Sequence, residues 1–313
     1  MDIHATVPGS DAAPSYSFAL WNLVIRPPRA KYHTWQLGPN DFTINGMHAM
    51  RRDFKLQAKN GGSLACSQYS PCAERGRAAP RRPVVVYLHG NSSNRLEAAG
   101  VLGPLLGKGI SLLCFDSAGC GQSDGDYVSL GWHERDDLAT VLEHLRRSPL
   151  CGPIGLWGRS MGAVTVLLHA DRDQSLGAIC LDSPFSSLRQ LAEDLASSNH
   201  AVCPLPYWLV LLGFAVVRMR VKALADFDME DVAPLEHAKR SFVPALFMHG
   251  RDDTFISSSH SRQLYDAYMG DKEFVAIEGD HNSERSDQAV DRAVDFFRRA
   301  FRLDDDDDEE DEP

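Results

Sequence analysis

The chain has 313 residues, of which 43% are hydrophobic and 24% charged, a composition typical of a globular protein that buries a substantial core. Most of its net charge of −11 comes from residues 304–312, which are nine acidic residues in a row, so the rest of the chain is nearly neutral. A nearly neutral body without a basic stripe argues against nucleic acid as a partner.

The cysteines and the N-terminus indicate in which compartment of the cell the protein works. Seven cysteines are scattered without CxxC spacing, and Cys114 and Cys180 lie inside apolar runs. This pattern is typical of free thiols in a reducing compartment. The N-terminus has no basic region followed by an apolar core, and Asp2 stands where myristoylation needs glycine. We therefore expect a cytoplasmic protein.

Residues 1–40 read as a Pro-rich N-terminal extension with one apolar stretch, 18–25. We interpret that stretch as a short helix docked on the body, with a membrane-surface contact as the alternative. Residues 48–58 and 63–69 flank the turn Asn60-Gly61-Gly62, which predicts a β-hairpin.

Apolar strand-like runs then alternate with helical patterns. The expected strands are 84–88, 110–115, 154–157, 178–181, 244–248 and 273–277, and the expected helices are 96–106, 133–147, 161–170, 257–268 and 284–301. Strands that are apolar throughout, separated by amphipathic helices, indicate a mostly parallel doubly wound sheet covered on both faces. The hairpin adds antiparallel strands at one edge. We therefore predict an α/β fold with a single domain at 41–303.

The alternation breaks once, at residues 185–242, which we interpret as a small helical lid insert. It contains a polar helix, 188–197, and an apolar segment, 206–217, that is too short to span a bilayer. This segment is a candidate wall of an acyl pocket; packing on the body and an interfacial membrane contact are alternatives. The pocket candidates are Tyr207, Trp208, Leu209, Leu212 and Phe214. The acidic tail, 304–313, is predicted to be disordered because its carboxylates repel one another.

The clearest chemical motif is Gly158-Arg159-Ser160-Met161-Gly162, between an expected strand and an expected helix. In a G-x-S-x-G nucleophile elbow, the turn from strand to helix leaves no room for a Cβ at either glycine, and it exposes the serine hydroxyl. Ser160 is therefore the candidate nucleophile, with Gly158 and Gly162 as the elbow glycines.

A serine hydroxyl needs a base to take its proton and an acid to orient that base. His281 and Asp253 each follow an expected strand, in the chain order Ser, Asp, His that accompanies this elbow. Two other carboxylates stay open as the acid: the adjacent Asp252, and Asp182 after the strand 178–181. Asp280, beside the base, is expected to cap its own turn.

An oxyanion hole made of backbone N–H groups would complete the site. Met161, which follows the nucleophile, is one candidate donor, and Asn91, after the strand 84–88, is the other, with Ser92 as the fallback. His89 and His249 precede glycines at strand ends, and we expect them to hydrogen-bond loop backbone.

Four segments together resemble the alpha/beta-hydrolase superfamily: residues 88–91 (LHGN), 116–123 (DSAGCGQS), the elbow, and 249–253 (HGRDD). Over about residues 43–302 the chain is similar to the serine aminopeptidase and monoacylglycerol-lipase-like group and to eukaryotic alpha/beta-hydrolase-domain proteins. Residues 26–30 (RPPRA) and 279–283 (GDHNS) resemble a plant and protist branch. The resemblance implies hydrolase chemistry and gives no substrate.

No phosphate-binding loop and no metal-ligand spacing occurs in the sequence, so we expect neither a cofactor nor a metal. The leading hypothesis is a serine hydrolase that cleaves a carboxylic ester or thioester of a small-molecule or lipid-like acyl substrate. A serine peptidase and a non-catalytic binding protein with the same fold are the alternatives.

Overall fold

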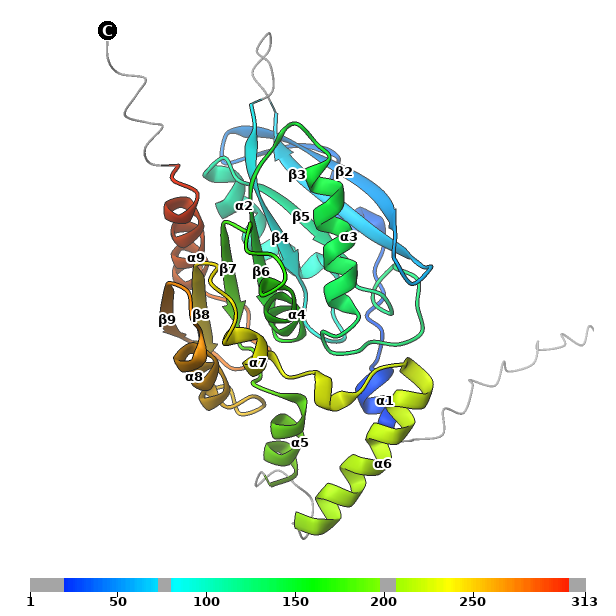
Figure 1. Ribbon diagram of the computed structural model, residues 1–313. Helices are drawn as coiled ribbons and strands as arrows, with labels where there is room; N and C mark the ends of the chain where they lie inside the picture. Colours follow the sequence, from blue (N-terminus) through cyan, green and yellow to red (C-terminus); the bar gives the residue numbers. More distant parts are fainter. Residues whose placement is uncertain (1–19, 73–79, 198–206, 304–313) are drawn as a thin grey trace, which may run out of the picture.

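The computed structural model describes residues 20–72, 80–197 and 207–303, and within them the strands form one nine-stranded sheet in the order β1-β2-β3-β5-β4-β6-β7-β8-β9 (Figure 1). Strands β5 to β9 along this order pair in parallel, whereas β1, β2 and β3 pair antiparallel at one edge. The strands are β1 (Asp41–Ile44), β2 (Met47–Gln57), β3 (Ser63–Pro71), β4 (Arg82–Leu88), β5 (Ser111–Phe115), β6 (Cys151–Arg159), β7 (Ala178–Asp182), β8 (Ala245–Gly250) and β9 (Lys272–Ile277).

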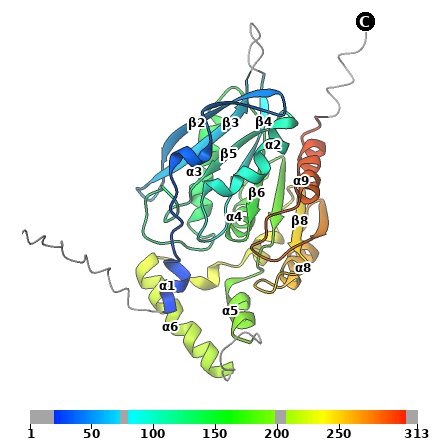
Figure 2. The ribbon, with the colours of Figure 1, turned by 180° about the vertical axis from the view of Figure 1, so that it is seen from behind.

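Helices cover both faces of the sheet (Figures 1 and 2). Apolar residues of α3, α4, α7 and α8 pack in a core on one face, and those of α2 and α9 pack on the other. The helices are α1 (Leu20–Ile25), α2 (Ala99–Gly107), α3 (Glu134–Arg146), α4 (Met161–Ala170), α5 (Leu188–Ser197), α6 (Tyr207–Ala225), α7 (Pro234–Ala238), α8 (Ser258–Ala267) and α9 (Asp287–Ala300), with 3-10 turns at Thr34–Leu37, Arg95–Ala98 and Met229–Asp231.

Strand β4 shows why the central strands are apolar throughout. Val84 and Val86 point into the core under α3 and α4, whereas Val85 and Tyr87 point into the core under α2 and α9. Successive side chains of a strand face opposite sides of the sheet, so a strand with a core on both sides needs apolar residues at every position. The prediction of a mostly parallel, doubly wound sheet is therefore confirmed.

The antiparallel edge contains the predicted hairpin, β2 and β3, and one strand more than expected. Strand β1 pairs with β2 through the two-residue turn Asn45-Gly46, where both residues have positive φ, 51° and 78°. Asn-Gly at such a turn is the residue pair that a tight hairpin with two left-handed positions prefers. The sequence signal was present, and the prediction missed it.

The N-terminal extension is fastened to the body by Arg29. Its guanidinium donates hydrogen bonds to the carbonyls of Gly121 (3.0 Å), Cys120 (3.0 Å), Gly125 (3.3 Å) and Ser123. These carbonyls belong to the loop after β5, at the edge of the sheet where the parallel strands end. The arginine of the RPPRA segment therefore shapes a loop on the side of the sheet that carries the site described below.

The insert is helical, as predicted, and α6 is longer than the apolar segment that marked it. Side chains of α5 and α6 form a third apolar cluster with α1 and with residues of the body that flank the site, including Met161 and Ile256. Phe214 packs partly buried on this cluster, whereas Leu212 is 54% exposed and faces away. The side chains of Tyr207, Trp208 and Leu209 lie outside the described part of the chain.

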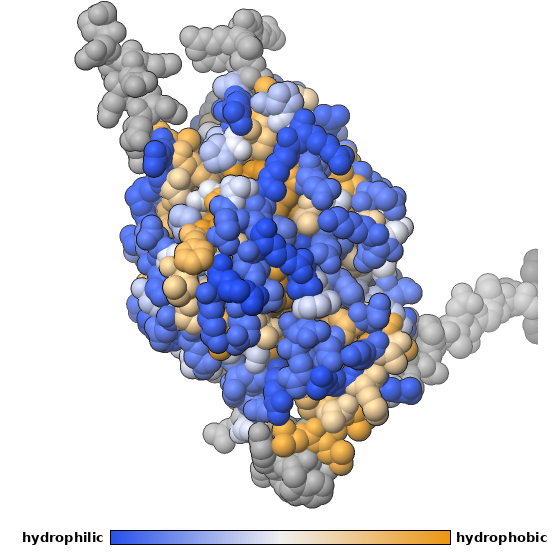
Figure 3. All heavy atoms as spheres, in the orientation of Figure 1, coloured by the Kyte–Doolittle hydropathy of each residue, from blue (hydrophilic) through white to orange (hydrophobic). Residues whose placement is uncertain are grey.

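The exposed side of α6 carries apolar residues together with Arg220 and Lys222, and Figure 3 shows the apolar ones gathered over this helix at the lower end of the molecule. Val216 and Met219 are 43% and 67% exposed there. Within the described ranges, none of the helices combines the length and hydrophobicity that crossing a membrane requires.

Three predictions concern residues outside the described ranges in whole or in part. The acidic tail at 304–313 and the start of the N-terminal extension lie outside them. Of the seven cysteines, the six that are described are free, and Cys203 is not described. The cytoplasmic location stays a prediction.

Candidate active site

The turn between β6 and α4 has the geometry of a nucleophile elbow. Ser160 has φ 51° and ψ −116°, a strained backbone conformation for a residue with a side chain. A Cβ on Gly158 would lie 2.5 Å from the backbone nitrogen of Ala163, and one on Gly162 would lie 2.6 Å from the carbonyl carbon of Leu88. Only glycine fits at either position, which is the physical reason for the G-x-S-x-G spacing.

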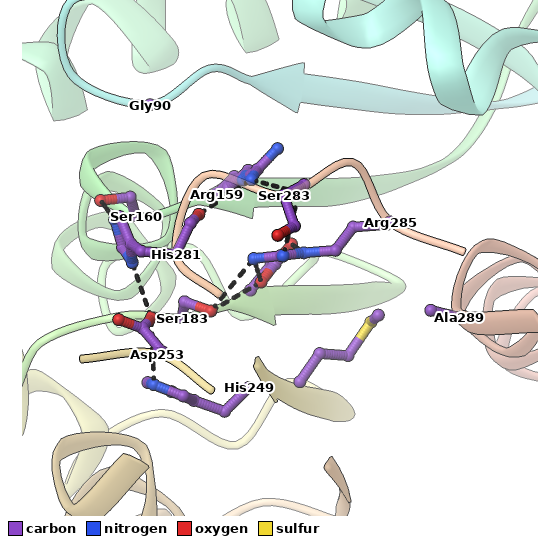
Figure 4. A network of polar contacts seen from close by, with 12 residues as sticks. Gly90, Arg159, Ser160, Ser183, His249, Asp253, His281, Ser283, Arg285 and Ala289 are labelled. Atoms are coloured by element: carbon purple, nitrogen blue, oxygen red, sulfur yellow. Dashed lines mark hydrogen bonds and ion pairs between the residues drawn. The ribbon is translucent and has the colours of Figure 1, made fainter. Parts of the chain in front are cut away.

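Three predicted residues meet at the carboxyl ends of the parallel strands (Figure 4). Nε2 of His281 lies 2.9 Å from Oγ of Ser160, and Nδ1 of His281 lies 2.7 Å from Oδ2 of Asp253. A carboxylate only accepts hydrogen bonds, so Nδ1 carries the imidazole proton and Nε2 is free to accept from the serine hydroxyl. This is the arrangement of a nucleophile, a base and an orienting acid.

The surroundings of Asp253 keep its carboxylate ionised. Burial alone would raise its pKa, but hydrogen bonding by His249 and His281 and the backbone N–H of Ile256 holds the pKa well below its ordinary value. Oδ1 accepts from the N–H groups of Phe255 (3.0 Å) and Ile256 (2.8 Å). The carboxylate of Asp253 is therefore both charged and fixed in orientation.

The two alternative acids lie in different surroundings. Asp252 is exposed to solvent. Asp182 accepts a bidentate pair of hydrogen bonds from Arg285, at 2.8 and 2.9 Å, and a third from the hydroxyl of Ser183. Asp280 accepts from the N–H groups of Asn282 and Ser283, so it caps its own turn as expected.

The predicted oxyanion donors belong to two segments that adjoin Ser160, the start of α4 and the turn after β4. Met161 is the first residue of α4, a position whose N–H has no partner within the helix. The turn after β4, which carries Asn91, lies close to Ser160. A Cβ on Gly90 in this turn would be 3.8 Å from Cβ of Ser160. The carboxylate of Glu97 holds this turn by accepting from the N–H of Gly90 at 3.2 Å.

The two histidines that precede glycines bond loop backbone, as expected. Nδ1 of His89 donates to the carbonyl of Gly90 (2.8 Å), and its Nε2 accepts from the N–H of Ser117 (3.1 Å). Nε2 of His249 donates to the carbonyl of Ile256 at 2.8 Å and lies 3.4 Å from Oδ2 of Asp253. The imidazole of His249 thus lies against the carboxylate of Asp253 (Figure 4).

Three residues near the site were missed by reasoning from the sequence. Arg159 and Arg285 bond the loop that carries His281. Phe255 is 51% exposed, and its ring centroid lies 5.1 Å from that of His281. No local pattern marks the arginines, because Arg159 bonds carbonyls more than 120 positions away and Arg285 pairs with Asp182, 103 positions away. Phe255 could have been noticed as an apolar residue two positions after the candidate acid.

The fold and the elbow define an alpha/beta hydrolase. The family model described as serine aminopeptidase, S33, matches residues 79–235, and the chain belongs to this family of hydrolases. The matched region contains Ser160 and Asn91 but ends before Asp253 and His281. In the described part of the chain, no group of three or more His, Cys, Asp or Glu side chains could hold a metal ion.

Among curated proteins, the chain is 33% identical over 201 residues to the uncharacterized protein YqkD of Bacillus subtilis, covering 63% of this chain and 64% of that one. It is 27% identical over 196 residues to the lysophosphatidylserine lipase ABHD12 of Danio rerio, covering 59% and 47%. The match thus spans less than two thirds of the length of either relative.

Among solved structures, the esterase Pf2001 of Pyrococcus furiosus superposes with a TM-score of 0.65 at 20% identity, covering 88% of this chain and 98% of that one. Acetyl xylan esterase 1 of Thermoanaerobacterium sp. JW/SL YS485 superposes with a TM-score of 0.62 at 18% identity, covering 83% and 85%. At such identities these similarities establish the alpha/beta-hydrolase fold.

Proposed function

We propose that this protein is a serine hydrolase that cleaves a carboxylic ester or thioester through an acyl-enzyme intermediate, with Ser160, His281 and Asp253 as its catalytic residues. The observation that carries the proposal is the continuous chain of hydrogen bonds from Oγ of Ser160 through His281 to Asp253, at 2.9 and 2.7 Å. Ser160 is only half-buried, so a substrate can reach its hydroxyl.

The steps of the reaction follow from these positions. Oγ of Ser160 attacks the acyl carbonyl while Nε2 of His281 takes its proton, and the N–H groups of Met161 and Asn91 hold the resulting oxyanion. The imidazolium then gives this proton to the leaving group, and the carbonyl re-forms as an acyl-serine. Water then attacks the acyl-serine while His281 takes its proton, and the imidazolium returns that proton to Oγ of Ser160 as the acid leaves.

The substrate we favour is a small molecule or lipid with an apolar acyl chain. Two observations support this: the relatives named above include a lysophosphatidylserine lipase and esterases, and apolar side chains of the insert share a cluster with Met161 beside the nucleophile. In this proposal the insert is a lid that shields the acyl-enzyme from water. The family description favours a serine aminopeptidase as the second candidate.

The first test is labelling by a fluorophosphonate probe, combined with a hydrolysis panel. We expect the wild-type protein to be labelled and Ser160→Ala to show neither labelling nor hydrolysis, with an unchanged circular dichroism spectrum. The panel contains p-nitrophenyl esters of increasing chain length, an acyl thioester and an aminoacyl amide. Turnover of the amide alone would favour the peptidase, and labelling of Ser160→Ala would show that the nucleophile is elsewhere.

A further inference from the structure

The loop that carries His281 runs from β9 to α9, and it is tied to the sheet by Arg159 of β6 and by an ion pair between its own Arg285 and Asp182 of β7. Asn282 and Glu284 on this loop are exposed, and within the loop the carboxylate of Asp280 organises one turn. An exposed loop with few apolar contacts opens easily unless other bonds hold it. The position of the base therefore depends on contacts with the rest of the molecule.

Two arginines hold the backbone of the loop, Arg159 from strand β6 and Arg285 from within the loop (Figure 4). Nη2 of Arg159 donates to the carbonyls of His281 (2.9 Å) and Ser283 (2.8 Å). Nη1 of Arg285 donates to the carbonyls of Asp280 (2.9 Å) and Ser283 (3.1 Å). The guanidinium of Arg159 thus holds the carbonyl of His281, and that of Arg285 holds the carbonyl of Asp280, the residue before it.

Arg285 is itself fixed by Asp182. The two side chains are 7% and 2% exposed and form a fork-to-fork pair, which is the most directional arrangement of an ion pair. The backbone carbonyl of Asp182 accepts the N–H of Ser160 at 2.8 Å. Asp182 therefore links the backbone of the nucleophile to the arginine that holds the loop of the base.

We propose that Arg159 and Arg285 are positioning residues that set the distance between His281 and Ser160, and that Asp182 is the anchor of Arg285. This inference rests on the proposed function of Ser160 and His281. Arg159 belongs to the elbow and Arg285 is anchored to it through Asp182, so the nucleophile and the base keep their spacing when the exposed loop moves. A displacement of about 1 Å between reacting groups costs about 100-fold in rate.

The test uses two variants of the full chain, here called the clamp variants, that remove different donors to the loop. Arg159→Met removes one set of donors. The pair Asp182→Asn with Arg285→Met removes the other set without leaving an unpaired buried charge, which would itself destabilise the fold. Arg292→Gln is the matched control, because Arg292 bonds the surface residue Glu273. Each protein is assayed well below its melting temperature for kcat and KM on a p-nitrophenyl ester and for its rate of fluorophosphonate labelling.

We expect kcat and the labelling rate to fall together by about 10- to 100-fold in both clamp variants, with KM within about twofold. Arg159→Lys, whose ammonium can still reach a carbonyl, should recover part of the loss, and Arg292→Gln should match the wild type. A purely structural role would lower the melting temperature and leave kcat of the folded protein unchanged. Wild-type labelling by either folded clamp variant overturns this inference, whereas an unlabelled wild-type protein overturns the proposed function instead.

Discussion

Replacing Asp253 by asparagine keeps the shape of the side chain and reverses one hydrogen bond. Oδ1 accepts two backbone N–H groups, so the amide oxygen of the asparagine takes that place and its NH2 group faces Nδ1 of His281, where Oδ2 now lies at 2.7 Å. An NH2 group cannot accept, so Nδ1 becomes the acceptor and the imidazole proton moves to Nε2. That nitrogen can then no longer take the proton of Ser160.

An inverted tautomer of this kind costs about 10⁴-fold in kcat, equivalent to about 5 kcal/mol of transition-state stabilisation. The assay is steady-state hydrolysis of a p-nitrophenyl ester by Asp253→Asn, Asp182→Asn and Asp252→Asn. Asp252→Asn should retain wild-type kcat because the side chain is exposed, and Asp182→Asn should lose less than Asp253→Asn. A greater loss in Asp182→Asn than in Asp253→Asn would refute the assignment of the acid.

Three further predictions concern stability, the insert and the tail. Burial raises the pKa of Asp137 to about 7, so the contribution of this carboxyl to the unfolding free energy should fall as the pH rises from about 4 to about 7. Asp137→Asn keeps an acceptor for the N–H of Ala118, and in urea denaturation its unfolding free energy relative to the wild type should be about 3 kcal/mol higher at about pH 8 than at about pH 5; an equal difference at both pH values would contradict this. Phe214→Ala should change the preferred acyl-chain length in the ester panel, whereas Leu212→Ala, which alters an outward-facing side chain, should not. If Phe214→Ala prefers the same chain length as the wild type, the result would count against the lid. Deletion of residues 304–313 should leave kcat unchanged, and a large loss would show that the tail takes part in activity.

The framework of the fold could be predicted because each of its signals is local. Strand β4 is a run of apolar residues, and α4 begins and ends where the pattern after the elbow indicates. The end of α6 was harder to predict, since residues 218–223 alternate basic and apolar side chains and are helical partly through tertiary contacts. One of these contacts joins Arg218 to Asp228 beyond the helix, where the guanidinium lies 2.8 Å from the carboxylate.

The choice between Asp182 and Asp253 shows where reasoning from the sequence stops. Both residues follow neighbouring parallel strands, so chain order and strand position left either one open as the acid. The partners of each carboxylate separate them. Both oxygens of Asp182 are taken by Arg285, and turning this carboxylate toward the imidazole would leave a buried guanidinium unpaired, at a cost of several kcal/mol. Asp253 has no such cation, and backbone N–H groups leave one oxygen free for His281. Asp253 is therefore favoured as the acid because of Arg285, which occupies Asp182. Arg285 lies 103 positions from Asp182, so no sequence pattern could reveal their pairing.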